Sequence, residues 1–160
     1  YIECFRNDEF QYMLYHNDPI NVNNLERYIA DTGKDIKFIG SIMDEDGFLK
    51  DVGFAHFYYK EENAYTYVGG VHPKYFNHGY GVYASIAMLS LIYDLYPNIK
   101  ITTGIYKHNQ RSLKADLAIG FTITSETDDK WLLQLTKDGF NNDFVWRIKS
   151  RIRSIELSRD

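Results

Sequence analysis

The residues best suited to chemistry lie where two glycines open a long apolar segment. Gly79-Tyr80-Gly81 follows the loop after Val71-His72-Pro73, and the residues beyond it are mostly apolar. The first N–H groups of a helix have no partners within the helix and carry the positive end of its dipole. They can hold a phosphate, and glycine lets that phosphate approach the backbone closely. The turn therefore predicts a phosphate-binding helix start, although Gly-x-Gly also occurs where elements merely pack tightly.

Two common nucleotide-binding motifs do not match this turn. A Walker A loop needs Gly-Lys followed by Ser or Thr, which is not found here. The dinucleotide fingerprint needs a third glycine where this chain has Ala84, and an acidic ribose ligand is not evident at the expected distance. The sequence therefore argues against both classes.

A second set of residues follows the turn at a characteristic distance: Asn109, Ser112 and Gly120-Phe121. Together with Val71-His72-Pro73 and Gly79-Tyr80-Gly81, this pattern resembles the GNAT superfamily (GCN5-related N-acetyltransferases). In that family a strand ending in Val-x-Pro leads to Arg/Gln-x-x-Gly-x-Gly/Ala, and an Asn, a small residue and Gly-Phe follow. The resemblance covers roughly the segment from Tyr65 to Leu135, and the N-terminal part only through the order of its elements.

The resemblance implies an N-acetyltransferase that uses acetyl-CoA as co-substrate. The acceptor would be a primary amine, on a small molecule or on a protein lysine or N-terminus, and it would attack the thioester directly. Backbone amides of the turn would hold the pyrophosphate, the preceding strand end would pair with the pantetheine arm, and the Val71 N–H would polarise the thioester carbonyl. The implied binding residues are Gly69, Gly70, Val71, Phe76, Asn77, His78, Gly79, Tyr80, Gly81, Asn109 and Ser112.

Three positions depart from the family pattern. Phe76 stands where Arg or Gln is usual, so pyrophosphate binding would depend on backbone N–H groups, helped by Lys74, Asn77 or His78. Tyr65 aligns with the glutamate base of many relatives, and Asp116 aligns with their tyrosine acid. An aspartate can donate a proton at neutral pH only if burial raises its pKa.

Asp116, Tyr65 and His72 are the candidate catalytic residues. His72 titrates in the useful range and sits at the end of a strand. Two of them also have alternative roles: Asp116 as a surface residue or a substrate-ammonium ligand, and His72 as a side chain hydrogen-bonded beside the turn. Other hydroxyl donors are Tyr80, Tyr83 and Tyr106.

Two other functions stay open. The departures at functional positions are compatible with a GNAT-fold interaction or regulatory protein that binds CoA weakly or not at all. The basic run from Arg147 to Arg153 is compatible with a modifier that docks on a macromolecule, or with a solvated helix face.

The elements that must position these residues follow from the apolar patterns. The sequence predicts one α/β (α+β) domain over residues 1–160, with a mixed, mostly antiparallel GNAT-type sheet of about six to seven strands and helices on both faces. We expect strands at 1–5, 36–43, 48–59, 65–71, 99–106, 121–126 and 131–136. We expect helices after 7–9, at 21–30, 79–95 and 109–118, and an additional C-terminal helix over 143–157.

Composition limits the surroundings and partners of the chain. A net charge of -4 and a pI of about 5.7 weigh against nucleic-acid binding and favour a cationic acceptor. The single cysteine excludes a disulfide framework, and the five histidines lack metal-ligand spacing, so no metal is predicted. We see no membrane-spanning stretch or leader and expect a cytoplasmic protein. A homodimer is compatible with the family resemblance.

Overall fold

We describe the fold from a computed structural model that covers residue 8 and residues 33–43 and 49–152. The strand expected at 1–5 and the helices expected in the first thirty residues lie outside these ranges. Within them, the strands expected from 36–43 to 131–136 and the helices expected at 79–95 and 109–118 are all present.

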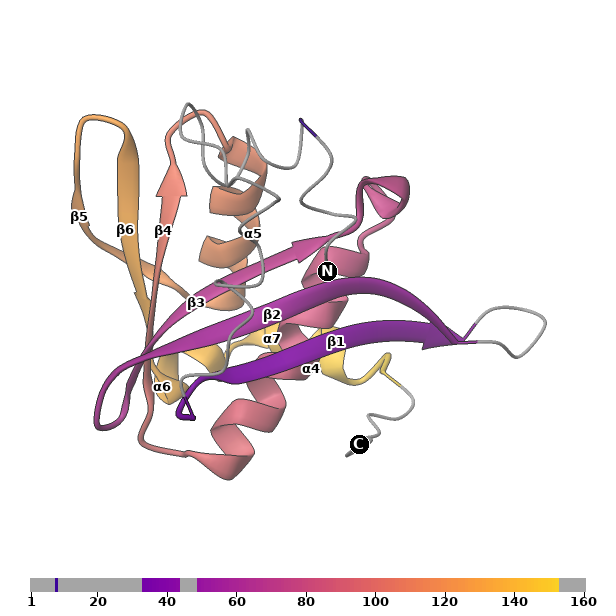
Figure 1. Cartoon of the computed structure of the whole chain (residues 1–160), viewed down its shortest axis with the longest axis horizontal. Coiled ribbons are helices and arrows are strands. Elements are labelled where there is room, and N and C mark those ends of the chain that lie inside the picture. The colour runs from indigo at the N-terminus through magenta and orange to yellow at the C-terminus, as the bar shows by residue number, and fades with distance from the viewer. Residues whose placement is uncertain (1–7, 9–32, 44–48, 153–160) are drawn as a thin grey trace.

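The described strands form one six-stranded sheet in the order β1-β2-β3-β4-β6-β5 (Figure 1). Of the neighbouring pairs among these strands, β3 and β4 are parallel and the rest are antiparallel. This confirms the mixed, mostly antiparallel sheet expected from the sequence. The strands are β1 (Ile36–Met43), β2 (Leu49–Glu61), β3 (Ala64–Val71), β4 (Lys100–Tyr106), β5 (Thr122–Glu126) and β6 (Lys130–Leu135).

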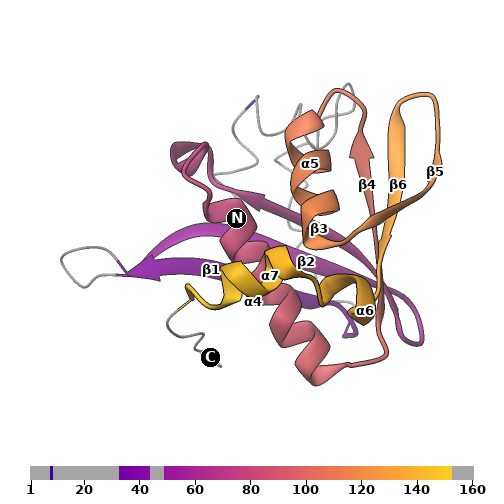
Figure 2. The ribbon, with the colours of Figure 1, turned by 180° about the vertical axis from the view of Figure 1, so that it is seen from behind.

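The longer helices of the described chain contact one another and lie on one face of the sheet (Figure 2). They are α4 (Tyr80–Leu95), α5 (Gln110–Ile119) and α7 (Asp143–Lys149). A 3-10 turn (Pro73–Tyr75) precedes α4, and a single-turn helix, α6 (Lys137–Phe140), precedes α7. Helices on the second face, which the sequence also predicts, stay a prediction, because the helices expected before residue 33 fall outside the described ranges.

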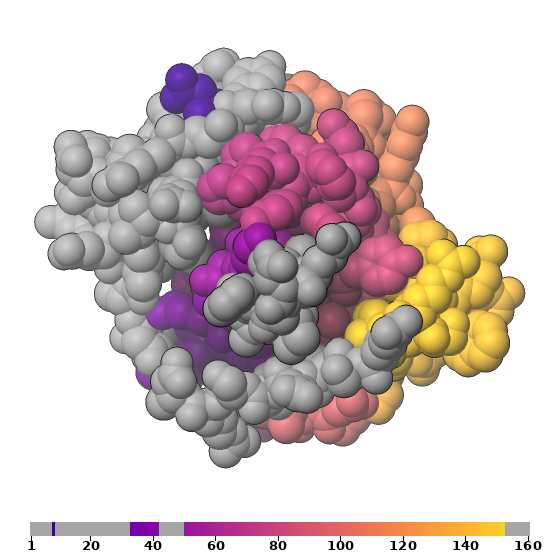
Figure 3. All heavy atoms as spheres, turned by 90° about the vertical axis from the view of Figure 1, so that its right-hand side faces the viewer, coloured from indigo at the N-terminus to yellow at the C-terminus, as the bar shows by residue number. Residues whose placement is uncertain are grey.

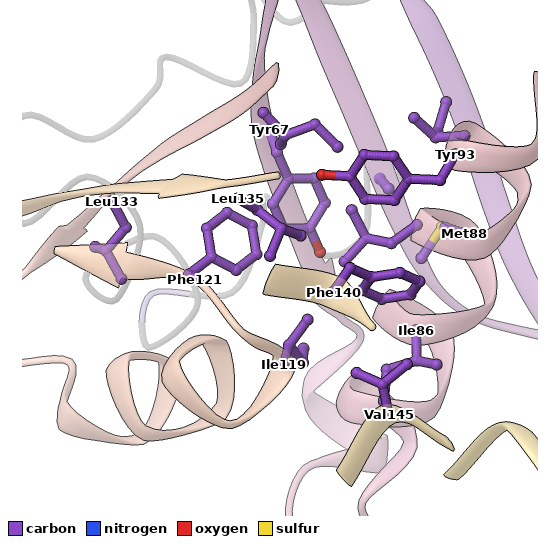
Figure 4. Close-up of a cluster of buried hydrophobic side chains, with 14 of the residues drawn as sticks. Tyr67, Ile86, Met88, Tyr93, Ile119, Phe121, Leu133, Leu135, Phe140 and Val145 are labelled. Carbon is purple, nitrogen blue, oxygen red and sulfur yellow. The ribbon is translucent and has the colours of Figure 1, made fainter. Parts of the chain in front are cut away.

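The main core lies between this helical layer and the sheet (Figure 4). Phe57 of β2 and Tyr67 of β3 meet the inner face of α4, while Phe121 packs on Tyr67 with ring centroids 6.4 Å apart. Burying one such large apolar side chain contributes roughly 1.5–3 kcal/mol. The Phe of the predicted Gly-Phe pair is therefore a core residue, which anchors the chain after α5 beneath the sheet.

Strands β3 and β4 separate after a short paired region. They pair only from Ala64↔Lys100 to Thr66↔Thr102, where the two threonine hydroxyls are 3.2 Å apart. Beyond this point β3 stays paired with β2 as far as Val71, and β4 stays paired with β6 as far as Tyr106. The two halves of the sheet therefore diverge, as Figure 1 shows, and the edge of β3 that faces β4 is left open.

The C-terminal segment differs from the sequence prediction in two places. The helix expected over 143–157 begins at Asp143 but ends at Lys149, because Ser150 caps it and Ile152 has already left the helix. Residues 153–157 lie outside the described ranges. The extra helix α6 is capped by the Thr136 side chain, which accepts from the Gly139 N–H. Four residues are too few to show a helical repeat in a sequence.

Gly120 ends α5 in a conformation that only glycine adopts easily. Its φ is 112°, and its N–H donates to the Asp116 and Leu117 carbonyls. A Cβ at this position would overlap the Gly139 carbonyl. The Asn142 side chain donates to the same carbonyl and to Ile119, at 3.0 Å each, which holds the end of α5 against α6.

This packing predicts that Gly120→Ala lowers the free energy of unfolding by about 2–5 kcal/mol, from the left-handed backbone and the overlap together. Gly79→Ala is the matched control, since Gly79 has a φ of 79° but no atom within 4 Å of its Cβ position. The Gly79→Ala substitution should lower the free energy of unfolding by only about 1 kcal/mol. Urea unfolding measures both, and equal losses would contradict the predicted overlap.

Candidate functional site

A cavity of about 400 Å³ lies where β3 and β4 diverge. Its wall is formed by the open end of β3, the second half of β4, the start of α4 and the start of α5. Among the lining residues in the described part of the chain, Arg111 has the only cationic side chain and Asp116 the only carboxyl group. The cavity therefore has one fixed positive and one titratable acidic group.

The glycines of β3 let an aromatic side chain lie along the strand. The ring of Tyr67 lies over Gly69, where a Cβ would overlap the phenol. Its hydroxyl reaches across to the Ser85 hydroxyl of α4, 3.0 Å away. Tyr67 thus fills the base of the gap between the strands, and its hydroxyl lies in the cavity wall.

The turn between β3 and α4 presents backbone donors to the cavity. Asn77 has a φ of 64° and Gly79 a φ of 79°, so the chain reverses sharply before the helix. In the part of the chain that the structure describes, the N–H groups of Tyr80 and Gly81 have no hydrogen-bond partner. A Cβ at Gly81 would lie 3.3 Å from the Val71 side chain, so the turn packs tightly on the strand end. These features fit an anion binding to the backbone.

Helix α5 begins on the opposite wall of the cavity. The Asn109 side chain caps it by accepting from the Ser112 N–H at 3.2 Å, and only 7% of Asn109 is exposed. Asn109 and Ser112 both line the cavity, as the sequence predicts. The Asn109 carboxamide oxygen, however, is already engaged in capping the helix. The small residue at Ser112 keeps the first turn of α5 close to the cavity.

Arg111 connects the two helix starts across the mouth of the cavity. Its Nη1 donates to the Asn77 Oδ1 at 2.9 Å, and its guanidinium lies 4.7 Å from the centroid of the Phe76 ring. The β3–α4 turn and α5, magenta and orange in Figure 3, lie side by side at the surface. Phe76 therefore carries no charge itself but supports the cation supplied by α5.

Asp116 lies deeper in the cavity, one and a half turns further along α5. Burial raises the pKa of its carboxyl from 3.8 to about 7. Burial, followed by the charge of nearby Asp116, also raises the pKa of the Tyr67 phenol. Ser85 opposes this second shift by hydrogen bonding. At neutral pH a substantial fraction of Asp116 is therefore protonated and can donate a proton.

The structure gathers most of the predicted binding residues around one cavity. The lining includes Asp116 and nine of the predicted binding residues: Gly69, Gly70, Val71, Phe76, Asn77, Gly79, Gly81, Asn109 and Ser112. The side chains of His78 and Tyr80 do not line it. They stack on each other at 5.8 Å, and the His78 ring bonds to the Phe76 carbonyl at 2.7 Å.

Two of the three catalytic candidates, Tyr65 and His72, lie outside the cavity lining. Tyr65 belongs to the paired part of β3, packs against Tyr59, and has a pKa raised mainly by burial, so it is poorly suited as a base. The His72 ring caps the 3-10 turn by accepting from the Lys74 N–H at 3.2 Å. Both side chains are occupied with holding the strand and the turn.

Sequence reasoning missed three residues of the site. Arg111 lies within the second motif, and a cation in the first turn of a helix, where the dipole disfavours it, could have drawn attention. Tyr67 and Ser85 gave no signal, because nothing in the sequence indicates that their hydroxyls meet across the gap.

Among the described residues there is no group of three His, Cys, Asp or Glu side chains that could hold a metal ion. No described helix has the length and apolar character to cross a membrane.

No family model matches the sequence, and no curated protein matches it by sequence. Its solved structural neighbours include GNAT-family acetyltransferases. One is an acetyltransferase of this family from Bacillus anthracis, with a TM-score of 0.65, 18% identity, and coverage of 85% of this chain and 87% of that one. Another is a chimera of the Vibrio cholerae spermidine N-acetyltransferase SpeG with hSSAT, with a TM-score of 0.64, 13% identity, and coverage of 88% and 92%.

A third neighbour is the aminoglycoside acetyltransferase AAC(6')-Ib, solved in complex with coenzyme A. It has a TM-score of 0.67 and 14% identity, and the match covers 96% of this chain and 91% of that one. At these identities the likeness establishes the fold: the chain has the mixed sheet and helices of the GNAT fold.

The raised pKa of Asp116 predicts a pH-dependent stability. The folded chain holds a proton that the unfolded chain releases between about pH 4 and pH 7, so stability falls as the pH rises through this interval. The Asp116→Asn variant has no carboxyl group to deprotonate there. At pH 8 its free energy of unfolding should exceed that of wild type by on the order of 1–4 kcal/mol, and at pH 4 the two should differ little. Urea unfolding at both pH values measures the gain. Asp128→Asn, at an exposed turn, is the control, and an equal gain in that variant would contradict the prediction.

Proposed function

We propose that this chain is an N-acetyltransferase that transfers the acetyl group of acetyl-CoA to a primary amine. One observation carries the proposal: an open strand edge and two helix starts surround a single cavity on a fold shared with acetyltransferases. One neighbour of that fold was solved with coenzyme A. The residues present fit such a ligand, because unpartnered backbone donors occupy the turn where a phosphate would lie.

Each part of the co-substrate has a matching part of the cavity. The edge of β3 from Gly69 to Val71 faces away from β2 and lacks a described strand partner, so it can pair with the amide groups of the pantetheine arm. The turn from Phe76 to Gly81 is suited to the pyrophosphate. The Val71 N–H, at the end of the open edge, is our candidate donor to the thioester carbonyl.

Acetyl-CoA supplies a thioester that a neutral amine can attack directly. As the amide forms, the amine gives up a proton and the departing sulfur takes one. We assign the donation to Asp116, because no other described residue brings a carboxyl group to the cavity lining and burial keeps Asp116 partly protonated at neutral pH. The proton released by the amine, through water, restores the carboxyl. No imidazole lines the cavity among the described residues, so we assign no side chain as the base.

The acceptor we propose is a cationic amine of the polyamine or aminoglycoside type. The net charge of -4 favours the approach of such molecules. Two neighbours of the same fold are named for spermidine and aminoglycosides. A panel of amines with a free-thiol readout would identify the acceptor.

The first test of the function is calorimetric titration with acetyl-CoA. Wild-type protein should bind it, and Gly81→Leu should abolish measurable binding, because the side chain would collide with Val71 and block approach to the turn. Gly81→Ala, with its Cβ 3.3 Å from Val71, should weaken binding much less. Thermal unfolding checks that both variants fold. Wild-type protein that shows no binding at millimolar acetyl-CoA would instead support a GNAT-fold interaction or regulatory protein.

The second test concerns Asp116. Asp116→Asn should lower kcat about 100-fold or more, with the affinity for acetyl-CoA unchanged, because a general acid acts only in the transition state. The wild-type kcat should fall as the pH rises through about 7, because the carboxyl loses the proton it donates. Unchanged turnover of the Asn variant, or a profile without this descending limb, would remove Asp116 from the mechanism.

A further inference from the structure

We propose that Arg111 binds the pyrophosphate of CoA and supplies, from α5, the positive charge that the β3–α4 turn lacks. The inference rests on the proposed function, since it concerns the same co-substrate. It assigns a binding role to a residue outside the Gly-x-Gly turn. Among the described residues, Arg111 is the only cationic residue that lines the cavity, and it lies against the turn that presents the backbone donors.

The Arg111 side chain is held in place, but most of its hydrogen-bond donors are not engaged by these contacts. The Phe76 ring supports one face of the guanidinium, and Asn77 accepts from Nη1 at 2.9 Å. A guanidinium has five N–H donors in one plane, so most of them remain for a ligand. Stacking and one hydrogen bond also restrict the long side chain beforehand, which lowers the entropy lost when an anion binds.

The local charges favour an anion at this position. Arg111 sits in the first turn of α5, where the helix dipole disfavours a cation, and neither α4 nor α5 has an acidic residue in its first turn. Within the described ranges, no carboxylate forms an ion pair with Arg111. The guanidinium and the starts of two helices therefore meet at the cavity mouth, and no described carboxylate neutralises their charge. A bound phosphate group would supply the missing negative charge.

The position of Arg111 along the cavity places it near the pyrophosphate of the proposed ligand rather than near its thioester end. Arg111 and Asp116 lie on the same helix five residues apart, about 7.5 Å along its axis. The acid lies at the base beside Tyr67, whereas Arg111 lies at the mouth against Phe76 and Asn77. A ligand that follows the open edge of β3 outward from Asp116 therefore reaches Arg111 where it meets the turn.

Titration calorimetry with CoA tests the assignment. Arg111→Gln should weaken CoA binding about 10- to 100-fold, as expected for loss of a charged hydrogen-bonding group. Lys114→Gln is the matched control, because Lys114 is an exposed cation on the same helix that does not line the cavity. It should change the affinity less than twofold. Equal losses in both variants would reduce Arg111 to a contributor to overall charge and overturn the proposal.

Dephospho-CoA separates the two phosphate groups that Arg111 could contact. It keeps the pyrophosphate but lacks the 3′-phosphate, so Arg111→Gln should weaken its binding by the same factor. A loss seen with CoA but not with dephospho-CoA would place Arg111 on the 3′-phosphate and overturn the assignment. If the wild-type protein binds neither ligand, the proposed function itself is refuted. If the wild-type protein binds both and Arg111→Gln leaves the affinities unchanged, only the role of Arg111 is refuted.

A rescue experiment distinguishes binding from a structural role. Phe76→Arg, combined with Arg111→Gln, returns a cation to the turn itself and should recover at least tenfold of the lost affinity. Phe76→Leu combined with Arg111→Gln should bind no better than Arg111→Gln alone. Thermal unfolding of each variant confirms its fold. If both variants fold but Phe76→Arg does not restore binding to Arg111→Gln, the site needs the Arg111–Asn77 contact rather than the positive charge. That result would overturn the proposal.

Discussion

The separation of β3 from β4 is the constraint on which the rest of the site depends. The two parallel strands pair over three residues each and then follow different neighbours, β3 with β2 and β4 with β6. Backbone groups along an open strand edge need partners. In our proposal the pantetheine arm, which has amides of its own, occupies this gap. The cavity lies between the diverging strands, where no described strand fills the space.

Close packing around the gap explains why small residues recur on its walls. Tyr67 can fill the base of the gap only because Gly69 leaves room for its ring. The strand end and the first turn of α4 touch at Val71 and Gly81, which brings the helix start to the end of the open edge. Beneath them, Phe121 packs on Tyr67 and ties the end of α5 to the same core. The glycines therefore bring backbone groups into position, while the aromatic residues keep the two halves of the sheet apart.

Helix α5 contributes both charged groups of the cavity. Its capped start holds Arg111 at the mouth, and a position further along holds Asp116 in a poorly hydrated part of the wall. The turn before α4 contributes neutral donors and the Phe76 ring on which the guanidinium rests. In our proposal, the cation and the proton donor therefore come from one rigid element, so the distance between them is fixed by helix geometry rather than by loop conformation.

The sequence by itself determined the order of the elements, the glycine-bearing turn and the spacing to Asn109 and Gly120-Phe121, because these depend on local periodicity and on residues that only certain backbone conformations accept. It therefore predicted the sheet, the helices at 79–95 and 109–118, and ten of the residues that line the cavity. Tertiary structure decided which side chains face the cavity. Tyr65 and His72 are near the motif in sequence but engaged elsewhere, whereas Tyr67, Ser85 and Arg111 meet partners on other elements. It also raised the pKa of Asp116, because burial depends on contacts between segments that are distant in the sequence.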